Sequence, residues 1–147
     1  MKIYKLPTLP LFAMVLVCSP ATAAQTRQWL SYGPVVVEVP GKLTLVRRYG
    51  PPNFGENPKT DAKLRVPILV LSEPVNVRGN AEYFPFDVEV RGIKRIQLLL
   101  FNLKTPCDPL VGKRVLVRGT LIHRHTGGHY TTVLMEVTSI AKSRRGR

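Results

Sequence analysis

The sequence predicts an all-β domain, and three observations support that class. No long segment repeats its apolar residues with the 3.6-residue period of a helix. Thirteen prolines and eleven glycines divide the chain into short runs rich in Val, Ile and Thr, which is typical of strands joined by turns. Several runs also alternate apolar and polar residues, so that one face of each strand is apolar.

Five strands are expected, separated by turn residues. Their ranges are 35–46, 63–71, 83–102, 113–122 and 130–140. The third range is interrupted between 90 and 93 and forms either one broken strand or a hairpin. A kink is expected at Pro40-Gly41, because both residues favour bends within sheets. Pro67 has no N–H to donate, which places the second strand at an edge or a bulge. A turn is expected at Ser72–Pro74, with residues 75–77 pairing briefly after it. The run Ile96–Phe101 is apolar on both faces and predicts a central strand covered on both sides.

A short helical turn is expected between the third and fourth strands, from Asp108-Pro109 to Gly112. Five strands with one such turn fit a small five-stranded Greek-key barrel of the oligonucleotide/oligosaccharide-binding (OB) fold, and an SH3-like barrel is the alternative. Gly119 allows the sharp coil that such a barrel needs at a corner. The apolar face of the fourth strand consists of Val115, Val117 and Leu121.

Residues 1–23 have the three parts of a secretory signal peptide. Two lysines supply the positive start, Leu11–Cys18 supplies the apolar core, and Ala21-Thr22-Ala23 is a small-x-small cleavage site. The apolar core is shorter than the roughly 20 residues that span a bilayer. We therefore expect export to the periplasm or the medium, with cleavage after Ala23, or after Ala24 as the near alternative.

The mature chain is strongly basic. Cleavage removes two lysines and no acidic residue, so the formal net charge falls from +13 to +11. The rest is expected to form a single β-barrel domain at 24–141 and a basic disordered tail at 142–147. The charge suggests an anionic partner, which after export is an envelope component or an acidic protein. Export and the lack of a clear ladder of exposed aromatic residues argue against nucleic acid.

Four motifs follow one another along the mature chain. They are Gly50-Pro51-Pro52-Asn53-Phe54, Ile96-Gln97-Leu98, the stretch 111–121 and the stretch 125–134. In this order they resemble an exported bacterial family, the domain of unknown function 4431, over roughly residues 30–141. The resemblance implies export and this fold, and it implies no activity. The family's hairpin usually reads His-Thr-Gly-His-His-His-Thr, whereas this chain has Gly128 and Tyr130 where further histidines are common.

The segment 121–130, Leu-Ile-His-Arg-His-Thr-Gly-Gly-His-Tyr, holds all three histidines of the chain. One interpretation is a zinc or copper site formed by His123, His125 and His129, since three converging imidazoles suit either metal. No Asp, Glu or Cys lies nearby in sequence as a fourth ligand. A catalytic role has less support, because no acid or nucleophile accompanies the histidines in sequence.

We expect a structural role for this segment in preference to metal binding or catalysis. Its imidazole and hydroxyl groups would bond backbone groups of a tight hairpin, and Tyr130 would pack across the strand pair. A third interpretation is a polar, cationic binding lip formed by His123, Arg124, His129 and Tyr130, because barrels of this kind bind ligands through loops and one sheet face.

The loop Gly50–Phe54 has two interpretations as well. It is either a rigid recognition loop that presents Tyr49 and Phe54 as aromatic contacts, or a stiff plug that buries Phe54 at one end of the barrel. We expect the plug, because loop aromatics in small domains often close a core. The sequence as a whole predicts a non-enzymatic exported binding module without a cofactor, with metal binding as the alternative.

Overall fold

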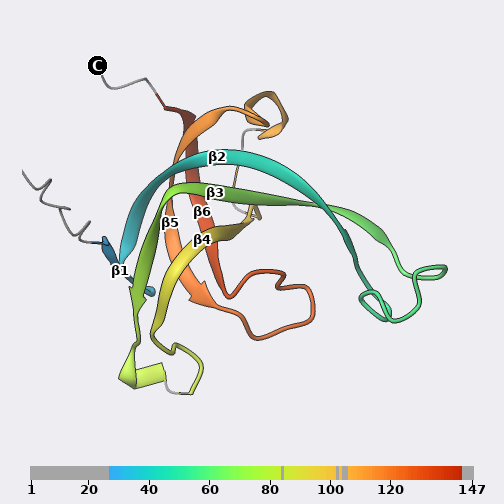
Figure 1. Cartoon of the computed structure of the whole chain (residues 1–147), viewed down its shortest axis with the longest axis horizontal. Helices are drawn as coiled ribbons and strands as arrows, with labels where there is room; N and C mark the ends of the chain where they lie inside the picture. Colours follow the sequence, from blue (N-terminus) through green and yellow to red (C-terminus); the bar gives the residue numbers. More distant parts are fainter. Residues whose placement is uncertain (1–26, 84, 102, 104–105, 144–147) are drawn as a thin grey trace, which may run out of the picture.

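The computed structural model describes residues 27–83, 85–101, 103 and 106–143 (Figure 1). The strands are β1 (Trp29–Ser31), β2 (Val36–Tyr49), β3 (Lys63–Arg78), β4 (Val90–Leu99), β5 (Arg114–His123) and β6 (Val133–Lys142). Two single 3-10 turns are η1 (Ala81–Tyr83) and η2 (Asp108–Leu110). No α-helix occurs among these residues, so the all-β prediction is confirmed. The expected signal peptide lies outside the described residues, as do residues 144–147 of the expected tail. Lys142, which was expected in the disordered tail, is instead the last residue of β6 because it pairs with Val115.

All six strands belong to one sheet, in the order β1-β3-β2-β5-β6-β4, and β3 also pairs with β4. Each of the five strands β2–β6 therefore has two neighbours among the others, and the pairings return to their starting strand. The short β1 adds to the end of β3 in parallel. Among the five, only β4 and β6 run parallel to each other. Because the pairings return on themselves, most strand edges are satisfied within the molecule.

The core lies on the inner face of these five strands. Val115, Val117 and Leu121 of β5 are fully buried, as their alternation predicts. At Gly119 the register of β5 against β6 shifts, and a side chain there would collide with the carbonyl oxygen of Glu136. Glycine is required at this bend because the two backbones approach too closely for any Cβ atom. The expected helical turn is present as η2.

Two expected boundaries were wrong. β3 does not turn at Ser72–Pro74 but continues to Arg78, because this segment forms an irregularity after which pairing with β4 resumes at Val75. A bulge absorbs the proline and lets the strand continue. β4 starts only at Val90, and Phe101 is 82% exposed because the strand ends at Leu99. Phe101 is therefore not covered on either side, although Ile96 and Leu98 are buried as expected.

The end of β2 (residues 45–49) and the start of β3 (residues 63–67) form a two-stranded arm that leaves the rest of the sheet (Figure 1). Pairing of β2 with β5 runs from Val36 to Lys42, whereas pairing with β3 continues to Tyr49. The pairing of β3 with β4 begins only at Ile68. Directly before it lies Pro67, which has no N–H to offer the neighbouring strand. The edge position predicted for Pro67 is confirmed, and β3 and β4 separate at this residue.

Candidate functional site

The loop 50–62, between β2 and β3, meets the loop 124–132, between β5 and β6. The hydroxyl of Tyr130 donates a 2.6 Å hydrogen bond to the carbonyl oxygen of Tyr49. A Cβ atom added to Gly127 would lie 3.3 Å from the Phe54 ring. Both loops extend to the right-hand side of the molecule in Figure 1. The two segments that the sequence analysis singled out therefore belong to one site.

A groove of about 430 Å³ lies between these loops, where β3 and β4 separate. Its apolar surface comes mainly from the arm and from the end of β4. The lining residues are Pro51, Phe54, Leu64, Arg65, Val66, Pro67, Gln97, Leu99, Phe101, Thr126, Gly128, His129 and Tyr130. Of the predicted binding residues, the groove brings together Phe54, His129 and Tyr130. Tyr49 lies beside it through its bond to Tyr130, whereas His123, Arg124 and His125 do not line it.

All three histidine rings bond to backbone groups of their own hairpin. Nδ1 of His123 lies 3.0 Å from the Arg124 carbonyl oxygen, and Nδ1 of His125 lies 3.1 Å from the His123 carbonyl oxygen. A carbonyl oxygen only accepts, so we assign the proton to Nδ1 in both rings. His129 has the opposite arrangement, since its Nδ1 accepts the N–H of His125 at 3.2 Å. Its neutral ring therefore carries the proton on Nε2.

These contacts do not assemble the predicted metal site. A metal-bound imidazole coordinates through one nitrogen and donates from the other, and His129 cannot do this while its Nδ1 accepts and its Nε2 is protonated. His123 lies against the ring of Tyr32, with centroids 6.1 Å apart, while His125 and His129 pack edge to face at 4.5 Å. Within the described part of the chain, no group of three or more His, Cys, Asp or Glu side chains is placed to hold a metal ion.

The surroundings of His129 keep it neutral. Burial, followed by the positive charges of His125 and Arg124, lowers the pKa of His129 below its ordinary value of 6.5. The neutral form is the one that can accept the His125 N–H at Nδ1. The ring thus has its hydrogen-bonding role at neutral pH, and protonation removes that role.

Gln97 of β4 holds the loop 124–132 in place, a role that the sequence analysis missed. Its buried side chain donates from Nε2 to the Gly128 carbonyl at 3.1 Å and accepts the Tyr130 N–H at Oε1 at 2.7 Å. The Gln97 backbone N–H also donates to the Thr131 hydroxyl at 2.9 Å. A single polar side chain within the apolar run Ile96–Phe101 was the signal that could have revealed it, because buried amides are almost always hydrogen-bonded.

Asp61 organises the loop 50–62 and was also missed. Its carboxylate accepts the backbone N–H groups of Asn53, Gly55 and Asn57 at 2.9, 2.7 and 3.2 Å, and the Asn53 side-chain amide at 3.2 Å. Burial by itself raises the pKa of this carboxyl group, but the hydrogen bonds from Gly55, Asn53 and Asn57 outweigh it and hold the pKa below its ordinary value.

The expectation that Phe54 is a buried plug was wrong. Phe54 is 44% exposed, and its backbone has a φ of +52°, in the left-handed region. The loop interior is occupied by Asp61 and its hydrogen bonds, so the aromatic ring is turned outward into the groove. A non-glycine residue in that region carries strain, which persists only where the surrounding contacts fix the backbone. The loop therefore presents Phe54 as a rigid contact.

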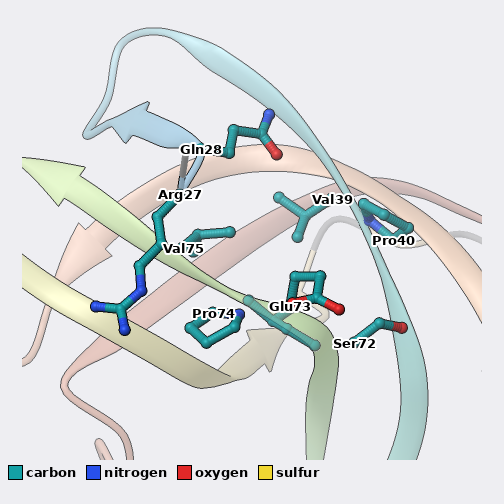
Figure 2. A pocket seen from close by; sticks show the side chains of 9 residues that line it. Arg27, Gln28, Val39, Pro40, Ser72, Glu73, Pro74 and Val75 are labelled. Carbon is teal, nitrogen blue, oxygen red and sulfur yellow. The ribbon is translucent and has the colours of Figure 1, made fainter. Parts of the chain in front are cut away.

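A second, larger cavity of about 550 Å³ lies at the irregular segment of β3 (Figure 2). Its apolar lining includes Val39, Leu71 and Val75, and Arg27 and Glu73 are its charged residues. None of the predicted site residues lines this cavity. It does not touch either of the loops 50–62 and 124–132.

Residues 95–141 match the model of a family described as domain of unknown function 4431. The match confirms the resemblance expected from the sequence over the second half of β4, all of β5 and nearly all of β6. It includes Gln97 and the loop 124–132, whereas the loop 50–62 lies outside it. No curated protein and no solved structure matches the chain. Among the described residues, no helix is long and apolar enough to cross a membrane.

Proposed function

We propose that this chain, which carries a domain of unknown function 4431, is an exported, non-enzymatic binding module. Its partner is an anionic or protein component of the bacterial cell envelope, and its place of action is the periplasm or the medium. The partner binds in the groove between the loops 50–62 and 124–132. The observation that carries this proposal is the convergence of Phe54, His129 and Tyr130 on one groove from two loops far apart in the sequence.

The strand arrangement supports the position of the site. We propose that β2–β6 form a small barrel of the OB type, because their pairings return to the starting strand and a single 3-10 turn joins β4 to β5. In such barrels ligands bind to the second and third strands and to the loops that follow the first and fourth strands. With β2 counted as the first strand, these elements are β3, β4 and the loops 50–62 and 124–132. They are the elements that line the groove.

The surface of the groove suits a binding partner. Phe54, Leu64 and Phe101 line it and are 44%, 37% and 82% exposed. Polar groups of Arg65, Thr126 and His129 lie beside this apolar surface. Exposed apolar surface with a polar rim is typical of interaction sites on proteins. The net charge of +13, or +11 after the expected cleavage, favours an anionic partner.

The contacts of the histidines favour binding over catalysis. A catalytic histidine commonly has a carboxylate or another group that orients it and a nucleophile or substrate proton within reach. Among the described residues, no carboxylate oxygen is hydrogen-bonded to any of the three imidazoles. All three rings are instead engaged with the backbone of the hairpin.

NMR titration of the isotope-labelled mature protein tests this function. The probes are lipopolysaccharide, phosphatidylglycerol vesicles, and the soluble periplasmic proteins of the producing bacterium. Binding should shift the signals of Leu99, His129 and Tyr130, and should weaken as salt is raised. Phe54→Ser should weaken binding at least several-fold, whereas the control Val35→Ser, at a similarly exposed position away from the groove, should not. Shifts confined to other surfaces, or equal effects of the two variants, would overturn the proposal.

A further inference from the structure

The open edge of β3 along the groove indicates what kind of partner binds there. We infer that the partner is an acidic polypeptide segment in extended conformation, which adds to β3 as a further strand beside Lys63–Pro67. This inference rests on the proposed function of the groove and names the class of partner. Strand addition to a sheet edge is a common mode of peptide recognition, in which the backbone provides affinity and alternate side chains provide specificity.

The groove follows an edge of β3 and not one of its faces. Four consecutive residues of this strand, Leu64 to Pro67, line the groove. Successive side chains of a strand point to opposite faces, so a groove on one face would contact only every second residue. β4 leaves this edge uncovered, because its pairing with β3 begins at Ile68.

The backbone groups of Lys63 and Arg65 point to the open edge. The backbone of Ala62 is hydrogen-bonded toward β2: its carbonyl accepts the Gly50 N–H at 2.7 Å, and its N–H donates to the Pro51 carbonyl at 3.0 Å. In an antiparallel pair, backbone groups of alternate residues face the partner strand, so the groups of residues 63 and 65 face away from β2. Within the described residues, no backbone group bonds to the outward N–H or carbonyl of either residue.

The charges of the arm select an acidic partner. Arg47 lies directly opposite Arg65 in the register, next to the pair formed by Tyr49 and Lys63, and all three cations are exposed. The ion pairs found among the described residues are elsewhere, at Glu89 and Glu38. Like charges directly opposite each other destabilise a strand pair. An acidic strand relieves this repulsion, whereas a second copy of this cationic chain would increase it.

The two faces of the arm predict the pattern of the added strand. Arg47, Arg65 and Lys63 share one face, and Leu64 and Val66 share the other. Side chains of an added strand also alternate between these faces. Acidic residues at every second position would therefore lie beside the cations, and apolar residues between them would lie beside Leu64 and Val66, near Leu99.

Fluorescence anisotropy with a short labelled peptide of alternating Glu and Val tests the inference on the mature protein. Two substitutions separate charge from backbone. Arg65→Gln removes the cation and should weaken binding about twofold to fivefold, as expected for an exposed ion pair. Arg65→Pro also removes the outward N–H without removing a bond to β2, and should weaken binding by about a further twofold to tenfold. Thermal unfolding of both variants checks that the arm is intact.

Modified peptides keep the test decisive if Arg65→Pro fails to fold. In an alternating peptide the N–H groups of Glu and of Val lie on opposite edges, so one of two copies, N-methylated at Glu or at Val, should lose at least about tenfold in affinity. A peptide with Lys in place of Glu should not bind. Equal binding of the parent and both methylated copies would overturn strand addition, as would equally tight binding of inorganic polyphosphate. Either result would leave the groove as a general anion-binding site. Absence of groove signals with every probe of the NMR titration would instead contradict the proposed function itself.

Discussion

The backbone N–H of Tyr130, in the loop between β5 and β6, donates a 2.7 Å hydrogen bond to the side-chain oxygen of Gln97 in β4. The other end of the same amide binds the Gly128 carbonyl, so the Gln97 side chain acts on the loop as a neighbouring peptide group would. This bond fixes the residue whose hydroxyl reaches Tyr49 on the arm. Gln97 thereby links β4 to both loops of the groove.

Gln97→Leu should destabilise the protein by about 1–3 kcal/mol, because it leaves the Tyr130 N–H and the Gly128 carbonyl without partners. Urea unfolding measures the change, and amide hydrogen exchange at Tyr130 should accelerate. Gln28→Leu is the matched control, since that side chain is exposed, and its effect should remain within about 0.5 kcal/mol. Equal effects of both substitutions would contradict the assigned role of Gln97.

Gly127 and Gly128 should differ in their tolerance of alanine. Neither has a left-handed backbone, but a Cβ atom on Gly127 would lie 3.3 Å from the Phe54 ring, whereas on Gly128 it would meet nothing closer than 4.0 Å. Gly127→Ala should therefore shift the ring resonances of Phe54 and weaken binding in the groove. Gly128→Ala should leave the Phe54 ring resonances unchanged, because its Cβ atom would not approach that ring. If the two variants behave alike in NMR spectra, Phe54 does not lie against Gly127 in solution.

The loop 124–132 should loosen under mildly acidic conditions. The pKa of His129 is lower in the folded protein than its ordinary 6.5, so the unfolded chain binds a proton first as the pH falls. The contribution of neutral His129 to stability is complete above pH 6.5, the ordinary pKa of the unfolded chain. It decreases as the pH falls below 6.5, until His129 is protonated in the folded protein as well. Hydrogen exchange of the His125 amide from about pH 7.5 to about pH 5 measures the change. His129→Asn, which keeps an acceptor that does not titrate, should remove this pH dependence.

Asp61→Asn should loosen the loop 50–62, because an amide cannot replace a carboxylate that accepts four hydrogen bonds. Hydrogen exchange at Gly55 and Asn57 should accelerate, and Glu56→Gln, at an exposed position, should have no such effect. The pKa of Asp61 is lowered, so its contribution persists above the ordinary carboxyl pKa and is lost as the pH falls through the folded value. Unchanged exchange in Asp61→Asn would contradict this role.

Export should be visible as a change of mass. Expression with the natural N-terminus should yield a periplasmic or secreted protein that begins at Ala24, or at Gln25 if cleavage follows Ala24. Intact-mass spectrometry of cell fractions distinguishes the two products. A bulky residue at position 23, as in Ala23→Phe, should block cleavage and retain the precursor. A full-length protein in the cytoplasm of the unmodified strain would refute the prediction.

Local pattern was sufficient to predict five of the six strands and much of the core, but not the short β1. Alternation identified the buried face of β5, and the absence of an N–H identified Pro67 as an edge residue. The predicted turn at Ser72–Pro74 was wrong because a strand can absorb turn residues when long-range pairing resumes after them. Such pairing is not visible in a short window of sequence.

The site was predicted only in part, because its geometry depends on contacts between distant segments. The histidine segment and the Gly50–Phe54 loop were both singled out, but nothing in either one showed that they meet. Phe54 was expected inside because loop aromatics often close a core. Asp61, whose hydrogen bonds fill the loop interior, has no distinctive sequence context that would have indicated otherwise. Gln97 did have a distinctive context, as an amide within an apolar run. Because a buried amide needs hydrogen-bond partners, that context indicated its role.

The arm and the groove share a chemical origin in Pro67. Where β3 would continue to pair with β4, the ring nitrogen offers no hydrogen, and the two strands separate. The missing donor therefore helps to keep the groove open, together with the end of β4 at Leu99. A residue with an N–H at this position would allow the seam between β3 and β4 to extend toward the arm. One missing backbone hydrogen thus favours an open groove over a continued sheet at this place.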